Sequence, residues 1–426
     1  MPITLRSKPL RIVLVTIEVI AFVLAVLRIG KAYFADVVSR KLDTEGLELA
    51  ARLDPASSDY HLKLGRLFQY SLTDINPSRA LAELGEAVRL SPLDAQAWLD
   101  LGAAQELQGN LDEAESTLRR ADQLAPHLPG FQWAIANFFL LRGNVEEAFR
   151  HFKLVLAGTS RYDSMIFSTA WKAVGDGDKI LATLIPDNID SQFDYLYYLL
   201  GQRKFPEAVK VWDRIAANPA PFDLERTRGY LDVLLAARMP DDAYRAWSDL
   251  QQRGLVPAAG DESNLLSNGD FEGELRNVGF GWRIVPAPGV YVGLDSTTFH
   301  SGGRSLLISF SGKGNLNYQN VYHIVKVTPG LVYEVRAFMK TDGITTDSGP
   351  RLELVDSYDP KALNDYSEPL TGTNATWTLL SLDFKPGPNT HFVSVCIARV
   401  PSQKLDNLIA GKVWVDDVTL KAAPRR

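Results

Sequence analysis

The distribution of apolar residues divides the chain into three stretches with different periods. Residues 12–27 form an apolar run that only Thr16 and Glu18 interrupt. From about residue 45 to 253, apolar positions recur every three or four residues, the spacing of one helix face. After residue 264 the apolar runs are short, alternate with polar positions and are separated by Gly, Pro, Asn and Asp, as in β-strands. The pattern therefore predicts an apolar helix, a helical region and a β domain.

The apolar run predicts a membrane-spanning helix. Basic residues flank it on both sides: Arg6, Lys8, Arg11, Arg28 and Lys31. Extended to Ile29, about 18 helical residues rise roughly 27 Å, close to the ~30 Å hydrocarbon core of a bilayer. We expect residues 1–40 to hold a tail and a single signal-anchor helix, with the N-terminus in the cytoplasm. The basic flanks leave the orientation open, and a signal peptide cleaved near residues 30–32 or a buried core helix are the alternatives.

The helical region contains a repeat of 34 residues. Ala80, Ala114, Ala148 and Ala182 are spaced by this period, and so are two prolines, Pro92 and Pro126. The clearest unit carries Trp98, Leu101, Gly102, Ala114, Leu118, Ala121 and Pro126. Gly102 and Ala114 are small, which lets two antiparallel helices approach closely, and Pro126 ends the second helix. The spacing predicts stacked helix pairs.

This unit resembles the tetratricopeptide repeat, in which W-x₂-L-G is followed by Ala, an aromatic residue or Leu, Ala and Pro. The resemblance implies an all-α, tetratricopeptide-type superhelix over residues 41–253, whose regularity declines beyond Ala182. It also implies an unknown protein partner, because such superhelices bind peptides or helices. A simple spacer is the alternative. The residues expected to pack the repeats are Trp98, Gly102, Ala114 and Ala148.

Six alternating runs in the C-terminal region are expected strands: Ser305–Phe310, Tyr333–Met339, Arg351–Asp356, Trp377–Phe384, Phe392–Arg399 and Lys412–Leu420. Many strands without helices between them predict an antiparallel sandwich or jelly roll. We place the sandwich at residues 264–421, with a linker at 254–263 before it and a tail at 422–426 after it.

Five motifs follow one another in this region: Asn264–Glu272, Gly281-Trp282, His300–Leu306, Val327–Tyr333 and Val413–Leu420. In this order they resemble the galactose-binding-like jelly rolls, particularly the carbohydrate-binding modules of bacterial xylanases and glucanases. The resemblance implies an all-β jelly roll that binds a polysaccharide, in a bacterial protein.

The same resemblance implies a structural calcium ion where the first and last strands meet the loop after His300. Glu272 and Asp417 would contribute side chains, and His300 or its loop a backbone carbonyl, since Ca²⁺ takes six to eight oxygen ligands. The alternative is that Glu272 and Asp416 or Asp417 only accept hydrogen bonds from turn amides.

Sugar binding requires aromatic faces together with amides or carboxylates in a concave site. The candidate residues are Tyr291, Tyr318, Gln319, Asn320, Tyr322, Tyr358 and Tyr366. Tyr318 and Tyr322 lie near two asparagines in the sequence and form the better cluster. For Trp282, Trp377 and Trp414 a packing role is favoured.

The net charge and the residue types present exclude several classes of function. The net charge of −6 argues against nucleic acid, whose phosphates need a basic surface. The single cysteine, Cys396, excludes an intramolecular disulfide and a cysteine-cluster metal site. From residue 264 onward 16 basic residues balance 16 acidic ones, which suits an uncharged ligand. The sequence lacks the H-E-x-x-H, G-x-S-x-G and phosphate-loop motifs, so we expect no enzyme.

Together these patterns predict a multidomain scaffold of the bacterial envelope. We expect a single-pass inner-membrane protein with its bulk in the periplasm or outside the cell. The repeats would bind a protein and the jelly roll a polysaccharide, in exopolysaccharide, O-antigen or cell-wall assembly. Two alternatives remain: a purely protein–protein scaffold with a structural sandwich, and a glycan-acting enzyme whose carboxylates converge from distant strands.

Overall fold

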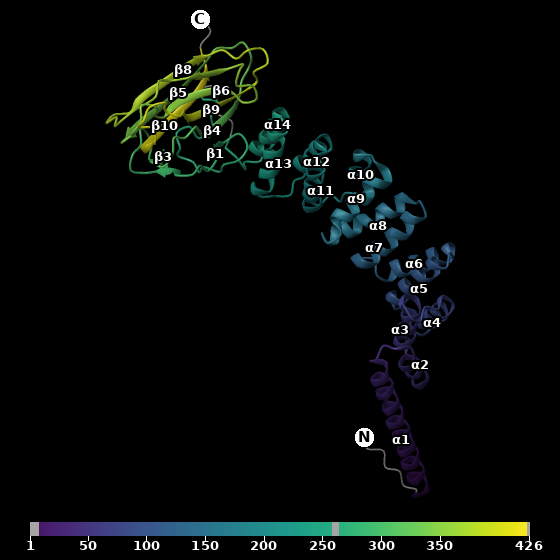
Figure 1. The fold of residues 1–426 in the computed structure, drawn as a ribbon. Helices are drawn as coiled ribbons and strands as arrows, with labels where there is room; N and C mark the ends of the chain where they lie inside the picture. The colour runs from purple at the N-terminus through teal and green to yellow at the C-terminus, as the bar shows by residue number, and fades with distance from the viewer. Residues whose placement is uncertain (1–7, 258–263, 424–426) are drawn as a thin grey trace. The chain divides into compact units, whose positions relative to one another are not determined.

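A computed structural model describes residues 8–257 and 264–423 (Figure 1). The chain divides into two compact units, residues 1–191 and 192–426, which are described separately. Residues 258–263 of the predicted linker and 424–426 of the predicted tail lie outside the described residues.

The first unit consists of helices joined by short turns. Their bounds are α1 (Lys8–Ser39), α2 (Thr44–Leu53), α3 (Ser58–Tyr70), α4 (Pro77–Leu90), α5 (Ala95–Leu107), α6 (Leu111–Leu124), α7 (Pro129–Leu141), α8 (Val145–Gly158), α9 (Asp163–Val174) and α10 (Gly177–Thr183). Polar residues cap several of these helices: the side chain of Asn76, for example, accepts a hydrogen bond from the Arg79 amide at the start of α4. This is the tetratricopeptide-like array that the 34-residue period predicts.

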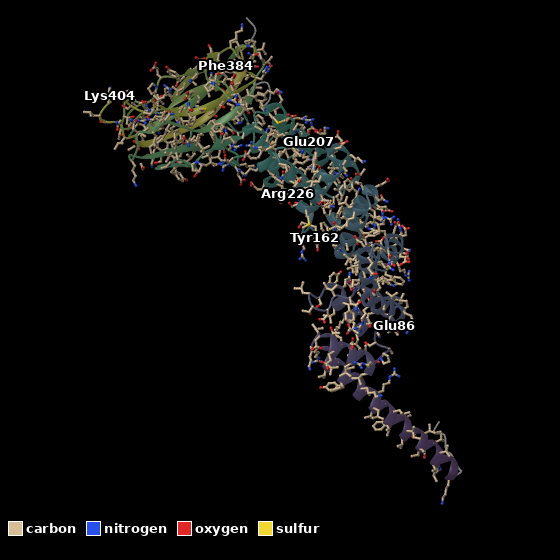
Figure 2. All side chains as sticks on the ribbon, turned by 45° about the vertical axis from the view of Figure 1, so that its right-hand side comes forward. Glu86, Tyr162, Glu207, Arg226, Phe384 and Lys404 are labelled. Atoms are coloured by element: carbon tan, nitrogen blue, oxygen red, sulfur yellow. The ribbon has the colours of Figure 1, made fainter. Side chains whose placement is uncertain are left out.

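Helix α1 has two different parts. Most of its apolar side chains are exposed and project away from the helix, as Figure 2 shows. Its stretch Arg11–Ser39 is long and apolar enough to cross a membrane, a test that a signal sequence also passes. Near the end of the helix, however, Ala35 and Ser39 are buried, and Ala35 packs with Ala50 and Tyr60. The last turns of α1 therefore belong to the first packed helix pair, although the sequence places the start of the repeats at residue 41.

The predicted packing residues lie between helices. Ala114 and Ala148 are fully buried. A Cβ atom added to Gly102 would lie 2.7 Å from the Leu118 side chain, so helices α5 and α6 approach closely at this position. Trp98 packs against the neighbouring apolar cluster, and its indole N–H donates to the Pro92 carbonyl.

The second unit begins with four helices. They are α11 (Ile189–Gly201), which starts at the boundary, α12 (Phe205–Ala217), α13 (Glu225–Ala236) and α14 (Pro240–Gln252). The strands that follow are β1 (Trp282–Ile284), β2 (Val290–Asp295), β3 (Ser305–Ser311), β4 (Tyr318–Lys326), β5 (Tyr333–Asp342), β6 (Arg351–Asp356), β7 (Asn364–Tyr366), β8 (Thr378–Phe384), β9 (Phe392–Arg399) and β10 (Ala410–Ala422). The compact unit thus includes two helix pairs that the sequence assigns to the repeats.

The strands form two antiparallel sheets, drawn in green to yellow in Figure 1. One has the order β1-β4-β9-β6-β7, and the other β2-β3-β10-β5-β8. Apolar side chains from both sheets fill one core, including Phe271, Leu306 and Val395. The predicted sandwich is therefore present, and its six predicted strands correspond to β3, β5, β6, β8, β9 and β10. The sequence did not predict β1, β2, β4 and β7.

Candidate functional site

A groove of about 650 Å³ lies on the outer face of the β1-β4-β9-β6-β7 sheet. Strand alternation creates this face: Leu352 and Leu354 of β6 are buried in the core, so Glu353 and Val355 face outward. Its lining includes Asp232, Leu235, Ala236, Arg283, Gln319, Tyr322, Asp356, Tyr358, Asn364 and Cys396. We call this cavity the sandwich groove.

One row of residues crosses all five strands of this sheet. In register, Arg283 of β1 lies opposite Tyr322 of β4, and Tyr322 lies opposite Cys396 of β9. Cys396 in turn lies opposite Glu353 of β6, which lies opposite Tyr366 of β7. With ~4.8 Å between strands, four strand spacings make this row about 19 Å long. We call these five residues the cross-strand row; it contains two tyrosines, two charged side chains and one cysteine.

Two polar atoms of the row are buried without a partner among the described residues. Glu353 is 2% exposed; its Oε1 accepts a hydrogen bond from Gln319 Nε2 at 3.0 Å, whereas Oε2 has no partner in the described part of the chain. Arg283 Nε is likewise without a partner among the described residues. An unsatisfied buried polar atom costs about 1–3 kcal/mol.

The loop after β6 supplies a second tyrosine. Asp356 Oδ1 accepts the backbone N–H groups of Tyr358 and Asp359, both at 2.8 Å, and this turn directs the loop over the groove. Burial raises the pKa of Tyr358 to about 12, so its hydroxyl stays protonated and able to donate near neutral pH. At the far end of the row, the Arg351 guanidinium lies 3.9 Å from the centre of the Tyr366 ring, which fixes that ring.

Cys396 has no features of a nucleophile. It is buried, and this burial, reinforced by Glu353, raises the pKa of its thiol. A neutral thiol is a poor nucleophile, so Cys396 acts as a small side chain on the floor of the groove.

The structure divides the predicted sugar-binding residues. Gln319, Tyr322 and Tyr358 line the groove, and Tyr366 ends the row. Tyr318 is only 1% exposed and packs against Phe310 in the core. The prediction that Tyr318 contacts a ligand is therefore corrected.

Two further predicted residues lie away from the groove lining. Asn320 donates to the Val285 carbonyl beside β1, and Tyr291, 61% exposed, lies on β2 of the other sheet. The groove also contains residues that the sequence did not single out: Asp232, Arg283 and Asn364. Arg283 and Asn364 come from strands too short to be predicted, and Asp232 comes from a helix.

The predicted calcium ligands converge on the His300–Arg304 loop. Glu272 accepts the amides of Gly303 and Arg304 at 2.7 and 2.9 Å, and these bonds lower its pKa. Asp417 lies 2.5 Å from His300 Nδ1 and accepts the Ser301 hydroxyl at 2.8 Å.

The neighbouring Asp416 is fully buried and accepts the amides of His300 and Ser301. Its burial raises its pKa, although these amide bonds act in the opposite direction. Within the described ranges, no group of three or more His, Cys, Asp or Glu side chains has the geometry to hold a metal ion. The hydrogen bonds fit the alternative in which the carboxylates hold turn amides, and calcium remains a prediction.

A second hollow, of about 1090 Å³, lies in the first unit between α8 and α10. Helix α10 has 7 residues and α8 has 14, so α10 covers only part of α8. Leu154 on α8 is 40% exposed there, and Lys153 and Lys179 line the same hollow. The hollow combines apolar, basic and acidic side chains, the last from Glu146 and Glu147.

Comparison with known proteins supports the class of the helical region. Residues 76–129 match the family model of the tetratricopeptide repeat. Such repeats form protein-interaction scaffolds, and this is the class of protein to which the array points. None of the curated proteins matches the chain.

Three solved structures are similar to parts of the chain. One is PilF of Pseudomonas aeruginosa, with 17% identity over 53% of this chain and 91% of PilF, at a TM-score of 0.27. Another is TmCBM61 in complex with β-1,4-galactotriose, with 18% identity over 38% of this chain and 99% of TmCBM61, at a TM-score of 0.27. The third is the enzymatically active domain of tailspike protein 4 of bacteriophage CBA120, with 15% identity over 38% of this chain and a TM-score of 0.27. The chain spans 21% of that tailspike domain.

Proposed function

We propose that this protein is a non-enzymatic, membrane-anchored scaffold of the bacterial envelope that binds an uncharged polysaccharide in the sandwich groove and a partner protein through its repeats. The cross-strand row carries the first half of the proposal. Tyr322 and Tyr366 offer aromatic faces to the C–H groups of sugar rings. The exposed side chains of Gln319 and Asn364, which line the groove, suit sugar hydroxyls. A row about 19 Å long favours a chain of several sugars over a single one.

The charges around the groove favour a neutral glycan. Arg283 and Asp232 form an ion pair at 2.8 Å, which leaves the carboxylates of Asp356 and Glu353 without a matching cation in the groove lining. A uronic acid would be placed beside these carboxylates, and like charges repel. From residue 264 onward the numbers of acidic and basic residues are equal, which agrees with an uncharged ligand.

The same residues favour binding of a glycan over its cleavage. Asp356 uses Oδ1 to hold two turn amides, and Cys396 is a neutral thiol. Neither is arranged as the nucleophile that retaining glycoside hydrolysis requires. Release of reducing sugars by the purified protein would favour the enzyme instead.

The test is glycan binding by the full-length protein in detergent. Affinity electrophoresis and calorimetry would use neutral polysaccharides (β-1,4-galactan, xylan, mixed-linkage β-glucan, dextran) and acidic ones (polygalacturonate, alginate). We expect a neutral polysaccharide to bind and Tyr322→Ala to weaken it by about tenfold or more, as expected for a buried aromatic contact. Tyr291→Ala, the same change on the other sheet, is the control and should leave affinity unchanged. Failure of every neutral polysaccharide to bind would refute the proposal.

For the repeats, we expect a helix of the partner protein to occupy the hollow between α8 and α10. The shortened α10 exposes a part of α8 that a longer helix would cover, and Leu154 gives it an apolar contact. A photo-crosslinking residue in place of Lys179 should give one discrete protein adduct in native membranes. Leu154→Arg in the same chain should abolish the adduct, whereas Leu72→Arg, at a turn position that is 96% exposed, should not. An adduct that survives Leu154→Arg would contradict this placement.

The membrane anchor is supported by the exposed apolar surface of α1. An anchored protein stays with the membrane after carbonate washing and keeps its original N-terminus. Recovery in the soluble fraction, or a mature N-terminus near residue 32, would indicate a cleaved signal peptide instead.

A further inference from the structure

Helix α13 borders the sandwich groove, although it belongs to the helical part of the chain. Asp232, Leu235 and Ala236 line the groove together with residues of the sheet. Asp232 also extends the cross-strand row, because its Oδ1 lies 2.8 Å from Nη1 of Arg283, the first residue of that row. Arg283 is only 16% exposed, so this contact lies within the lining and not at its rim.

Hydrogen bonds and a second ion pair hold α13 and α14 against the sandwich. The Arg228 guanidinium donates to the backbone carbonyls of Arg276 and Asn277, just before β1. Lys326, at the end of β4, lies 2.9 Å from Asp241 of α14. These contacts reach both strands that carry the start of the row.

An aromatic cluster adds apolar contact at the same place. Tyr244 of α14 meets Phe280 edge-on, with ring centres 5.2 Å apart, and also contacts Phe392. Trp247 packs against Phe280 and against Gly279, where an added Cβ would lie 2.6 Å from the indole ring. Such close packing fixes α14 on the sandwich, and Leu231 of α13 lies 3.0 Å from the same added Cβ.

From these contacts we infer that α13 is one wall of the glycan site, so that a bound chain touches the last helix pair as well as the sandwich. This inference rests on the proposed function, since the ligand is the same uncharged glycan. Leu235 and Ala236 give the site an apolar ledge, and Asp232 neutralises Arg283. The charge balance at Arg283 thus depends on a residue outside the sandwich.

The experiment compares variants of the full-length protein in detergent. Ala236 is exposed at the end of α13, and Ala217 is exposed at the end of α12 without lining the groove. Ala236→Trp should fill the groove and weaken binding of the neutral polysaccharide by about tenfold or more, whereas Ala217→Trp should leave it unchanged. Circular dichroism would establish that both variants are folded. Equal affinity of the two variants would overturn the inference while leaving the proposed function intact.

A second variant tests the electrostatic role of the wall. Asp232→Ala removes the ion-pair partner of Arg283 and leaves its guanidinium free to meet a ligand. We expect weaker binding of the neutral polysaccharide and a gain in binding of polygalacturonate, because the free cation attracts carboxylates. A merely structural Asp232 would lower the affinity for both polysaccharides alike, and that result would refute its role in selectivity. If the unaltered protein binds no neutral polysaccharide, the inference fails together with the proposed function.

Discussion

The contact between Gly279 and Trp247 allows a direct test of how helices α13 and α14 are held against the sandwich. The backbone of Gly279 has φ +51°, in the left-handed region. An added Cβ would lie 2.6 Å from the Trp247 ring and 3.0 Å from Leu231, which belong to α14 and α13. Gly279→Ala therefore introduces backbone strain of about 1–2 kcal/mol and an overpacked contact of about 1–3 kcal/mol.

Gly330→Ala is the matched control. Gly330 has φ +80°, so an alanine there carries a similar backbone strain, but no atom lies within 4 Å of the added Cβ. The difference between the two variants isolates the clash with α13 and α14. At 1.4 kcal/mol for each factor of ten, about 1–3 kcal/mol corresponds to a 5- to 150-fold increase in the opening of these helices.

Hydrogen–deuterium exchange of the full-length protein measures that opening. We expect amides of α13 and α14 to exchange faster in Gly279→Ala by a factor in this range, with the protection of β9 and β10 unchanged. Gly330→Ala should leave α13 and α14 at their original rates. Equal exchange of the two helices in both variants would refute the claim that this contact holds them against the sandwich.

Three further predictions concern the helices and the predicted ion. Gly102→Ala should lower the free energy of unfolding of the repeats by about 1–3 kcal/mol, because the added Cβ meets Leu118. Gly85→Ala, where no atom lies within 4 Å of the added Cβ, should raise this free energy by up to about 1 kcal/mol. Urea titrations of the two variants would compare these effects. Burial lowers the pKa of His151 to about 4 in the folded state, against about 6.5 when unfolded, so His151 stabilises the fold fully above pH ~6.5. That contribution, at most about 3 kcal/mol, should be lost as the pH falls from about 6.5 through 4. His151→Gln should therefore reduce the pH dependence of the urea midpoint. An unchanged pH dependence in this variant would contradict the prediction. If Glu272 holds calcium, a chelator should lower the melting temperature of the sandwich, and an unchanged temperature would argue that the carboxylate only holds amides.

The sequence predicts elements well where one period holds over many residues. The 34-residue spacing of the alanines locates the helix pairs because Ala80, Ala114 and Ala148 are buried where two helices approach closely, whereas Ala182, the last on the period, is exposed. Strands β1 and β7 have only 3 residues each, too few for alternation to be recognised. Strand β4 is long, but its register shifts between Tyr318 and Val321, so both residues face the core although they are three positions apart.

The same shift explains why the candidate site was predicted only in part. Regular alternation would place Tyr318 and Tyr322 on the same face, whereas the irregularity turns Tyr318 into the core and leaves Tyr322 in the groove. Asp232 and Arg283 are 51 residues apart in the sequence and meet only because α13 packs on the sandwich. Strand register and helix docking are long-range properties that a local pattern does not contain.

The burial of Ala35 and Ser39 has a practical consequence for shortening the chain. A truncation at residue 41 would strip Ala50 and Tyr60 of their neighbour and expose an apolar surface at the first helix pair. A cut near residue 31 would instead remove the lipid-compatible stretch and keep the last turns of α1 on the repeats. Water-soluble fragments for crystallisation should therefore begin inside the long helix, several residues before its end.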